Sequence, residues 1–343
     1  MNKYYIKFGI SQKSNAGSKA MKDIMLLLEV QGYKPVLSLP TTANKIIKLI
    51  DIPILLLTLI FKIRKNGSII YFIPSNILRI KFLKAFRKVI GFKLICFIND
   101  IESMRMEKSE KYTHAEMNSI SVADIVLVPN DNSVQILRNK YHFTNHLIPV
   151  GVWDYLNNFK YIASEHTANM AFHNKFVAFA GNLNKAPFIS ELSLVNLNFK
   201  IWGSSTEEKQ DRNIELMGKK TPDELIENIS GCTWGLVWDG TSIDTCCGHL
   251  GTYLRFNNSH KCGLYLAARV PVIVWEESGM ASFVNKYKVG ICVSSLHEAA
   301  DIINSMTPNE YIIYQKNVQS IGPLISKGNF FLEAIKKAEK LVI

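Results

Sequence analysis

Four short polar segments of this 343-residue chain carry residue types that bind phosphate or move protons. Each lies next to an apolar run, three of them directly after a run of strand length. Ligands of open α/β sheets bind beyond the carboxyl ends of the strands, where loops and helix N-termini face the ligand. The chemistry is therefore expected in residues 11–19, 99–102, 180–185 and 257–261.

Two of these segments have the composition of phosphate-binding loops. Residues 11–19 (SQKSNAGSK) contain Gly17, which allows a ligand to approach the backbone closely. Residues 180–185 (AGNLNK) combine Gly181, Asn182 and Lys185, so that backbone N–H groups and one point charge can hold a diphosphate. For both segments an ordinary connecting loop is the alternative.

Residues 257–261 (NNSHK) open a predicted helix with Ser259 as its N-cap. Lys261 then lies in the first turn, where the helix dipole disfavours a cation. A bound anion, attracted by both the helix N-terminus and Lys261, would account for a lysine there. Asn258 and His260 are further candidate donor-binding residues, although a lone histidine more often has a structural role.

Residues 99–102 (NDIE) follow a predicted strand. Asp100 is the candidate catalytic base, because a carboxylate at a strand end can deprotonate an acceptor hydroxyl. Two alternatives stay open: Asp100 and Glu102 form a divalent-metal pair, or Asp100 caps the following helix. The metal pair is disfavoured because the lysines can neutralise a leaving diphosphate, so we predict no metal and no cofactor.

Aromatic residues cluster in the second half of the chain. Trp238 and Tyr253 stand beside glycine-rich loops and are candidates for stacking on a sugar or base, whereas Trp234, Tyr265 and Trp275 are expected in the core. No GxSxG, Walker A or HExxH pattern occurs, which weighs against hydrolases and nucleotide triphosphatases.

The elements around these segments alternate between strand and helix. Strands are predicted at 4–10, 34–39, 68–74, 93–100, 123–129 and 146–151, and again at 176–182, 199–204, 233–240, 271–275 and 289–294. A capping box at Thr221 predicts a helix from Pro222. The pattern predicts an α/β fold of two facing Rossmann-like lobes with a cleft between them. The first lobe is residues 1–155, and a C-terminal helix (328–343) is expected to pack back on it. The second lobe is residues 170–327.

The excess of positive charge lies in the N-terminal half of the chain, which indicates an anionic partner. Residues 1–150 hold 22 Lys+Arg against 10 Asp+Glu, and residues 44–95 hold eleven basic residues and one acid, Asp51. The apolar run 49–61 is shorter than the roughly 20 residues of a bilayer span. We predict peripheral contact with an anionic membrane surface; a buried helix beside a solvated basic face is the alternative. Nucleic acid is disfavoured, since no nucleic-acid motif is present.

No cleavable leader is evident, so a cytoplasmic protein is predicted, peripheral at the inner face of the membrane if it binds lipid. The six cysteines lack metal-ligand spacing and are predicted to be reduced thiols. A homo-oligomer is compatible with the sequence.

Four runs carry a family resemblance: 99–105 (NDIESMR), 179–185 (FAGNLNK), 234–240 (WGLVWDG) and the long run 251–275 (GTYLRFNNSHKCGLYLAARVPVIVW). They resemble the bacterial GT-B glycosyltransferases that include β-1,6-galactofuranosyltransferases and accessory glucosyltransferases of serine-rich-repeat adhesins. The resemblance covers nearly the whole chain. It departs from the family at Asn99, where histidine is expected, and at Ser259, where proline is expected.

The resemblance implies a GT-B fold, a UDP-sugar donor bound mainly by the second lobe, no required metal, and inversion at the anomeric carbon. It implies donor binding by Asn182, Lys185, Asn258 and Lys261, with Asp100 as base. The predicted function is the transfer of galactofuranose or glucose from a UDP-sugar to a lipid-linked glycan acceptor in surface polysaccharide synthesis. The alternatives are a glucosyltransferase extending GlcNAc on a glycoprotein adhesin, a nucleotide-sugar epimerase, and a silent partner of the same fold.

Overall fold

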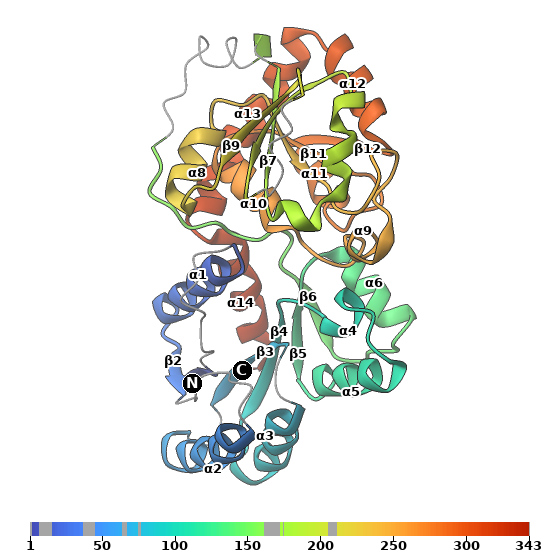
Figure 1. Ribbon diagram of the computed structural model, residues 1–343. Coiled ribbons are helices and arrows are strands. Elements are labelled where there is room, and N and C mark those ends of the chain that lie inside the picture. The colour runs from blue at the N-terminus through green and yellow to red at the C-terminus, as the bar shows by residue number, and fades with distance from the viewer. Residues whose placement is uncertain are drawn as a thin grey trace. The chain divides into compact units, whose positions relative to one another are not determined.

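The computed structural model describes residues 2–6, 16–36, 45–63, 67–74, 77–160, 172–173, 175–204 and 211–342. The chain divides into two compact units (Figure 1). Unit 1 comprises Met1–Val150 and Phe331–Ile343, and unit 2 comprises Gly151–Phe330. Residues 11–15 of the first predicted loop lie outside the described residues.

Unit 1 is built on a six-stranded parallel sheet in the order β2-β1-β3-β4-β5-β6. Strands β3 and β5 are buried along their whole length, as expected of parallel strands covered on both faces. The strands are β1 (Lys3–Ile6), β2 (Lys34–Val36), β3 (Ser68–Ile73), β4 (Lys93–Ile98), β5 (Ile125–Val128) and β6 (His146–Pro149). The helices are α1 (Ala16–Val30), α2 (Lys45–Lys62), α3 (Ile77–Ile90), α4 (Glu102–Arg105), α5 (Glu110–Ile120) and α6 (Asp131–Asn139).

The last helix, α14 (Asn329–Val342), contributes to the core of unit 1. It lies beside β3 and β4, two strands that are far from it in the sequence (Figure 1). The ring of Phe331 packs edge-on against Phe97 of β4, with ring centroids 5.3 Å apart. Lys3 of β1 pairs with Glu339 at 2.7 Å. The buried positions Ala334, Ile335, Ala338 and Val342 follow helical spacing, so one stripe of α14 faces the sheet.

Unit 2 contains a second six-stranded parallel sheet, in the order β12-β11-β10-β7-β8-β9. The chain order reverses at β7, which has β8 on one side and β10 on the other. The strands are β7 (Phe176–Ala180), β8 (Asn198–Trp202), β9 (Ile214–Gly218), β10 (Trp234–Val237), β11 (Val272–Trp275) and β12 (Gly290–Val293). The helices are α8 (Pro222–Ile229), α9 (Gly248–Tyr253), α10 (His260–Ala267), α11 (Ala281–Tyr287), α12 (Leu296–Ser305) and α13 (Pro308–Ser326), with 3-10 helices η1 (Leu183–Lys185) and η2 (Pro187–Leu194).

Two hydrophobic clusters cover the two faces of this sheet. One joins β10 residue Val237 to α8, α10 and α13, and the other joins Trp234 and Leu236 of the same strand to η2 and α12. Neighbouring residues of β10 thus point to opposite faces, as the pleat requires.

Helix α13 contains Gly322-Pro323, a pair of residues that disfavours a helix interior. Pro323 lies near the C-terminal end of α13. The helix begins with a capping box between Thr307 and Glu310. Burial of Val318, Ile321 and Ile325 against the sheet offsets the hydrogen bond that the proline removes.

Among the described residues, no helix combines the length and the apolar character needed to cross a bilayer.

The predicted helix start at Thr221 is confirmed, since its hydroxyl accepts from the Glu224 N–H while the Glu224 carboxylate accepts from the Thr221 N–H.

Candidate functional site

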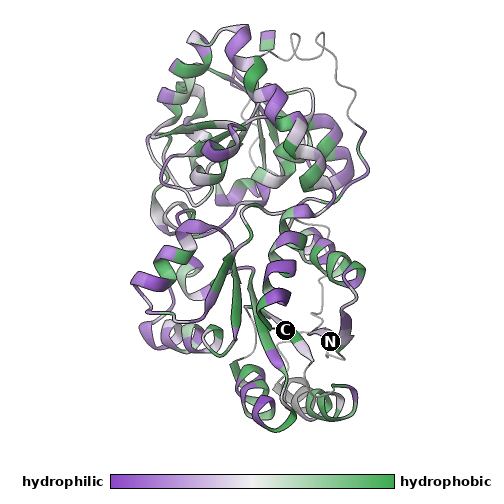
Figure 2. Ribbon diagram, turned by 180° about the vertical axis from the view of Figure 1, so that it is seen from behind, coloured by the Kyte–Doolittle hydropathy of each residue, from purple (hydrophilic) through white to green (hydrophobic). Residues whose placement is uncertain are grey.

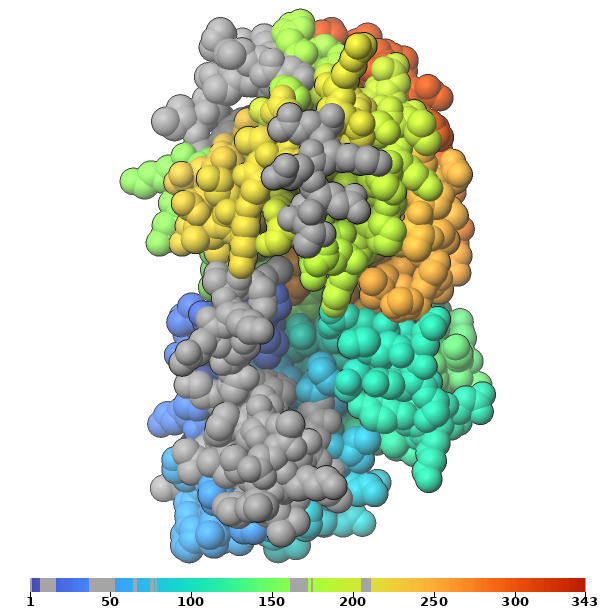
Figure 3. Space-filling model, in the orientation of Figure 1, coloured from blue at the N-terminus to red at the C-terminus, as the bar shows by residue number. Residues whose placement is uncertain are grey.

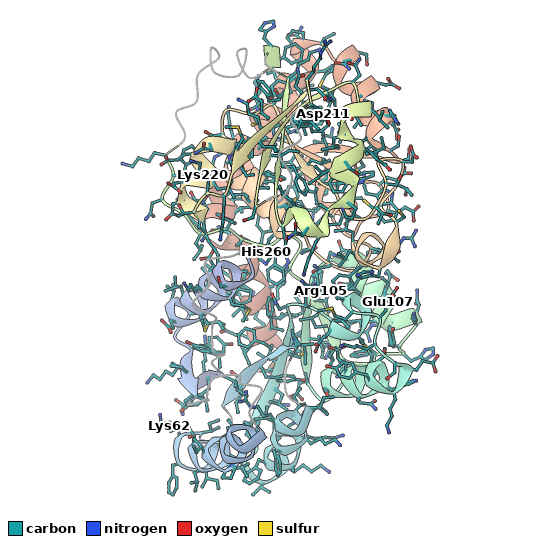
Figure 4. The ribbon with its side chains drawn as sticks, in the orientation of Figure 1. Lys62, Arg105, Glu107, Asp211, Lys220 and His260 are labelled. Atoms are coloured by element: carbon teal, nitrogen blue, oxygen red, sulfur yellow. The ribbon has the colours of Figure 1, made fainter. Side chains whose placement is uncertain are left out.

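The strongest candidate site lies where the chain order of the second sheet reverses, between β7 and β10. In a doubly wound sheet this switch point is where ligands bind, outside the carboxyl ends of the strands. Residues 180–185 begin at the last residue of β7, residues 238–240 follow β10, and residues 257–261 include the first two residues of α10. We call these residues the β7/β10 edge. Figure 4 labels His260 at the start of α10.

Lys261 is held at this edge by a carboxylate. Its Nζ lies 3.1 Å from both carboxylate oxygens of Asp239, and 5.4 Å from the ring centroid of Phe179 at the end of β7. The side chains of Lys261 and Asp239 are 17% and 25% exposed, so the pair is partly shielded from water. The Ser259 hydroxyl accepts from the backbone N–H of Lys261 at 3.3 Å, which confirms the predicted N-cap.

Two glycines allow α10 to lie where it does. A Cβ at Gly235 of β10 would approach the Tyr265 ring to 2.3 Å, and one at Gly263 of α10 would approach the Trp153 carbonyl oxygen to 2.1 Å. The Tyr265 hydroxyl in turn accepts from the backbone N–H of Ala180 at 2.9 Å. Close packing through these positions fixes the start of α10 against the ends of β7 and β10.

Asn258 and His260 have structural contacts at the same edge. The Asn258 amide donates to the Gly151 carbonyl at 3.2 Å, and the Asn258 carbonyl accepts from the Trp153 indole at 2.7 Å. The His260 ring stacks on Trp153 with centroids 5.0 Å apart. Asn258 is 1% exposed, so its side chain mainly ties residues 151–153 to α10.

Gly181, Asn182 and Lys185 lie on the surface at the carboxyl end of β7. The Asn182 side chain accepts from the Asn184 N–H at 3.2 Å and caps η1, which ends at Lys185. Gly203, at the end of β8, lets this loop pack closely, since a Cβ there would lie 2.4 Å from the Gly181 carbonyl oxygen. These three predicted residues therefore share one sheet edge with Lys261.

Both aromatic candidates, Trp238 and Tyr253, are buried. Trp238 is fully buried in the core and its indole donates to the Ser242 carbonyl at 2.9 Å, so its ring has no face for a ligand. The alternation of β10 continues through residue 238, which directs the indole to the face away from α10. Tyr253 is 7% exposed and its ring stacks on Phe256.

The same alternation identifies a residue that the sequence interpretation missed. Gly235, Val237 and Asp239 share the face of β10 that meets α10, and Asp239 there reaches Lys261. A period-two count from the buried strand would have found it.

Asp100 in unit 1 follows β4 and is oriented by Arg105. The Arg105 Nη1 lies 2.5 Å from Asp100 Oδ2. The capping alternative for Asp100 is wrong, because the N-cap of α4 is Ile101 with no side-chain hydrogen bond. Instead, the buried Glu116 of α5 accepts from the backbone N–H groups of Glu102 and Ser103, at 2.9 Å each.

Glu102, the second residue of the alternative metal pair, accepts from the Tyr112 hydroxyl at 2.7 Å. Within the described ranges, no group of three or more His, Cys, Asp or Glu side chains is arranged to hold a metal ion. Gly17, the remaining candidate, is the second residue of α1 and is exposed.

The cysteines differ in the direction of their pKa shifts. All six are free. A hydrogen bond between the Thr241 hydroxyl and the Cys247 sulfur, 3.1 Å apart, lowers the pKa of Cys247, whereas burial raises the pKa of the adjacent Cys246.

A cavity of about 460 Å³ occurs at the opposite edge of the same sheet. It lies at the amino ends of β7 and β8, and its lining includes Lys175, Asn198 and Asn304. The Lys175 amine is 3.5 Å from the Asn304 side-chain oxygen. This cavity is distinct from the β7/β10 edge.

Family models match almost the entire chain. The N-terminal domain of the glucosyltransferase 3-like family matches residues 3–149, and its C-terminal domain matches residues 177–338. The chain is 26% identical over 328 residues to the β-1,6-galactofuranosyltransferase WbbI of Escherichia coli K12, covering 95% of this chain and 94% of that protein. It is 25% identical to glucosyltransferase 3 of Streptococcus gordonii over 71% of this chain and 70% of that protein.

Solved structures share the architecture. Sucrose-phosphate synthase of Thermosynechococcus elongatus has a TM-score of 0.64 at 12% identity, over 99% of this chain and 98% of that one. Anabaena Alr3699/HepE in complex with UDP has a TM-score of 0.61 at 13% identity, over 99% and 100%. The predicted GT-B fold is thereby confirmed.

Proposed function

Because the chain belongs to the glucosyltransferase 3-like family of glycosyltransferases, we propose that it transfers a hexose from a UDP-sugar to a glycan acceptor. The names of its relatives support galactofuranose or glucose as the sugar. The observation that carries the proposal is the position of Lys261, a cation in the first turn of α10 at the switch point of the second sheet.

Unit 2 binds the donor diphosphate at the β7/β10 edge. The α10 N-terminus and Lys261 attract its negative charge, and Asn182, Lys185 and the backbone at Gly181 supply further donors. Asp239 keeps the Lys261 amine over the strand ends before the donor arrives. As the bond to the sugar breaks, charge grows on the departing UDP, and a fixed ammonium stabilises that charge without reorganising.

No divalent metal is needed in this scheme, because Lys261, Lys185 and the helix N-terminus supply the positive charge. Transfer rates should therefore be the same with EDTA and with added magnesium. A loss of turnover in EDTA that magnesium restores would refute this part of the proposal.

Asp100 acts as the base that removes the proton of the acceptor hydroxyl, in a direct displacement that inverts the anomeric centre. Arg105 orients its carboxylate. NMR of the product linkage tests inversion, and a retained configuration would refute it.

The acceptor is proposed to be a lipid-linked glycan of surface polysaccharide synthesis. The alternative is a GlcNAc-bearing glycoprotein, the acceptor suggested by the resemblance to accessory glucosyltransferases of serine-rich-repeat adhesins.

A panel measuring UDP release tests the function. UDP-glucose, UDP-galactose, UDP-galactofuranose and UDP-GlcNAc are each supplied alone, with a lipid-linked glycan, or with a GlcNAc-bearing peptide. Acceptor-dependent UDP release from one donor supports the transferase and names its sugar. Conversion of a donor without any acceptor indicates an epimerase, and UDP binding without turnover indicates a silent partner.

A further inference from the structure

Helix α2 exposes an apolar face. Leu57, Ile60 and Phe61 are 55%, 52% and 82% exposed, and Pro53 is exposed one turn before them. Their spacing places them on one side of the helix, while Leu55, Leu59 and Ile63 are buried on the other. A helix on a water-facing surface normally presents polar residues outward, so this face is suited to an apolar environment.

The neighbouring helix α3 exposes positive charge. Lys81, Lys84 and Lys88 are exposed at helical spacing, and Val89 beside them is 83% exposed. The other described cations of α3 are engaged elsewhere: Arg79 is buried, and Arg87 pairs with Asp124 at 2.5 Å. The sequence contains no acidic residue between positions 52 and 99.

The two helices contact each other and lie side by side in unit 1 (Figure 1). Seen from behind, much of α2 is coloured as hydrophobic (Figure 2). Atoms of α2 and α3, coloured blue, are on the surface in the space-filling view (Figure 3). Lys62 ends α2 directly after Phe61 (Figure 4). An apolar strip therefore borders a row of lysines, which we call the α2/α3 surface.

The charge decides which partner fits this surface. A second copy of the chain would bring two rows of lysines together with no carboxylate between positions 52 and 99 to offset them. An anionic bilayer satisfies both features, because the acyl boundary accepts the apolar side chains and lipid phosphates attract the lysines. We propose that the α2/α3 surface docks the protein on a membrane containing anionic phospholipid, with α2 lying in the interface.

Docking of this kind would hold the enzyme at the inner face of the membrane, beside a lipid-linked acceptor. The docking itself does not depend on the donor chemistry proposed above, so an experiment can refute the docking proposal without refuting the proposed function, and the reverse.

Sedimentation with vesicles tests the proposal. The whole chain is mixed with phosphatidylcholine vesicles or with vesicles that also contain phosphatidylglycerol. The wild type should partition preferentially to the anionic vesicles, and added salt should weaken binding. Each lysine near such a surface contributes roughly fivefold, so Lys81→Gln, Lys84→Gln and Lys88→Gln together should lower the partition coefficient by about a hundredfold.

The apolar strip is tested by Leu57→Ser, Ile60→Ser and Phe61→Ser together, which should lower the partition coefficient by at least about tenfold. Matched controls lie in unit 2: Ile313→Ser with Leu324→Ser on α13, and Lys219→Gln with Lys220→Gln, all at exposed positions. Both controls should bind vesicles as the wild type does.

The variants must remain folded, which their melting temperatures and their UDP release with a soluble acceptor would show. The proposal is overturned if the wild type shows no preference for anionic vesicles, or if the control variants lose as much binding. It is also overturned if sedimentation without lipid shows a dimer that the apolar-strip variant abolishes, since a second copy would then be the partner.

Discussion

Replacing Lys261 by methionine separates the two roles that the structure gives this lysine. Methionine keeps an unbranched side chain of similar length and removes the charge. If the amine stabilises the departing UDP, its loss resembles the loss of one oxyanion donor, about 3 kcal/mol or 10²–10³ in kcat. Initial rates of UDP release at saturating donor and acceptor measure this effect.

The same change also affects stability, because it leaves Asp239 without its partner. Exposed pairs contribute about 0–1 kcal/mol, and breaking a fully buried pair costs about 3–5 kcal/mol. With side chains 17% and 25% exposed, this pair lies between those limits. We expect a loss of about 1–2 kcal/mol in the free energy of unfolding of unit 2, measured by urea denaturation.

The double variant Lys261→Met, Asp239→Asn distinguishes the two effects. Removing the unpaired carboxylate should restore most of the stability and none of the turnover. Asp239→Asn alone should slow turnover by about tenfold, since the amine is no longer held in place. Near-normal UDP release by Lys261→Met would refute the donor assignment, and a double variant as unstable as the single one would refute the pairing argument.

Three further outcomes are expected elsewhere in the chain. Asp100→Asn should lower kcat by about 10²–10⁴ with little change in the donor KM, because it removes the base; a change confined to KM would place Asp100 outside the chemistry. Gly263→Ala should lower the melting temperature, since its Cβ would meet a main-chain oxygen at 2.1 Å and such overpacking costs about 1–3 kcal/mol. Gly231→Ala, with nothing within 4 Å, is the matched control and should melt almost as the wild type does. Thr241→Val should raise the pKa of Cys247, since the hydroxyl that lowers it is lost, and should move the pH profile of iodoacetamide alkylation to higher pH by intact mass. An unmoved profile would contradict the assigned cause.

Local signals explain what was predictable from the sequence. Alternating buried strands and helices indicated two parallel sheets, and the caps at Thr221 and Ser259 placed two helix starts correctly. Strand ends are local features as well, which is why Gly181, Asn182, Lys185 and Lys261 could be named before their arrangement was known.

What escaped prediction depends on tertiary packing. Asp239 and Lys261 are separated by 22 positions in sequence, and their pairing follows only once α10 is packed on β10. The glycine beside Trp238 suggests an open ring face, but the pleat of β10 directs the ring into the core. Helix α13 continues through Pro323 because its buried stripe outweighs local propensity.

The position of α14 has a consequence for synthesis on the ribosome. Unit 1 takes its first 150 residues from the start of the chain and its last helix from the end, whereas unit 2 is one continuous segment. Because Phe331 and Ile335 fill the core of unit 1, that core cannot close until translation has passed both residues. Unit 2 is therefore the part that can fold first during elongation, although the residues that begin unit 1 emerge before it.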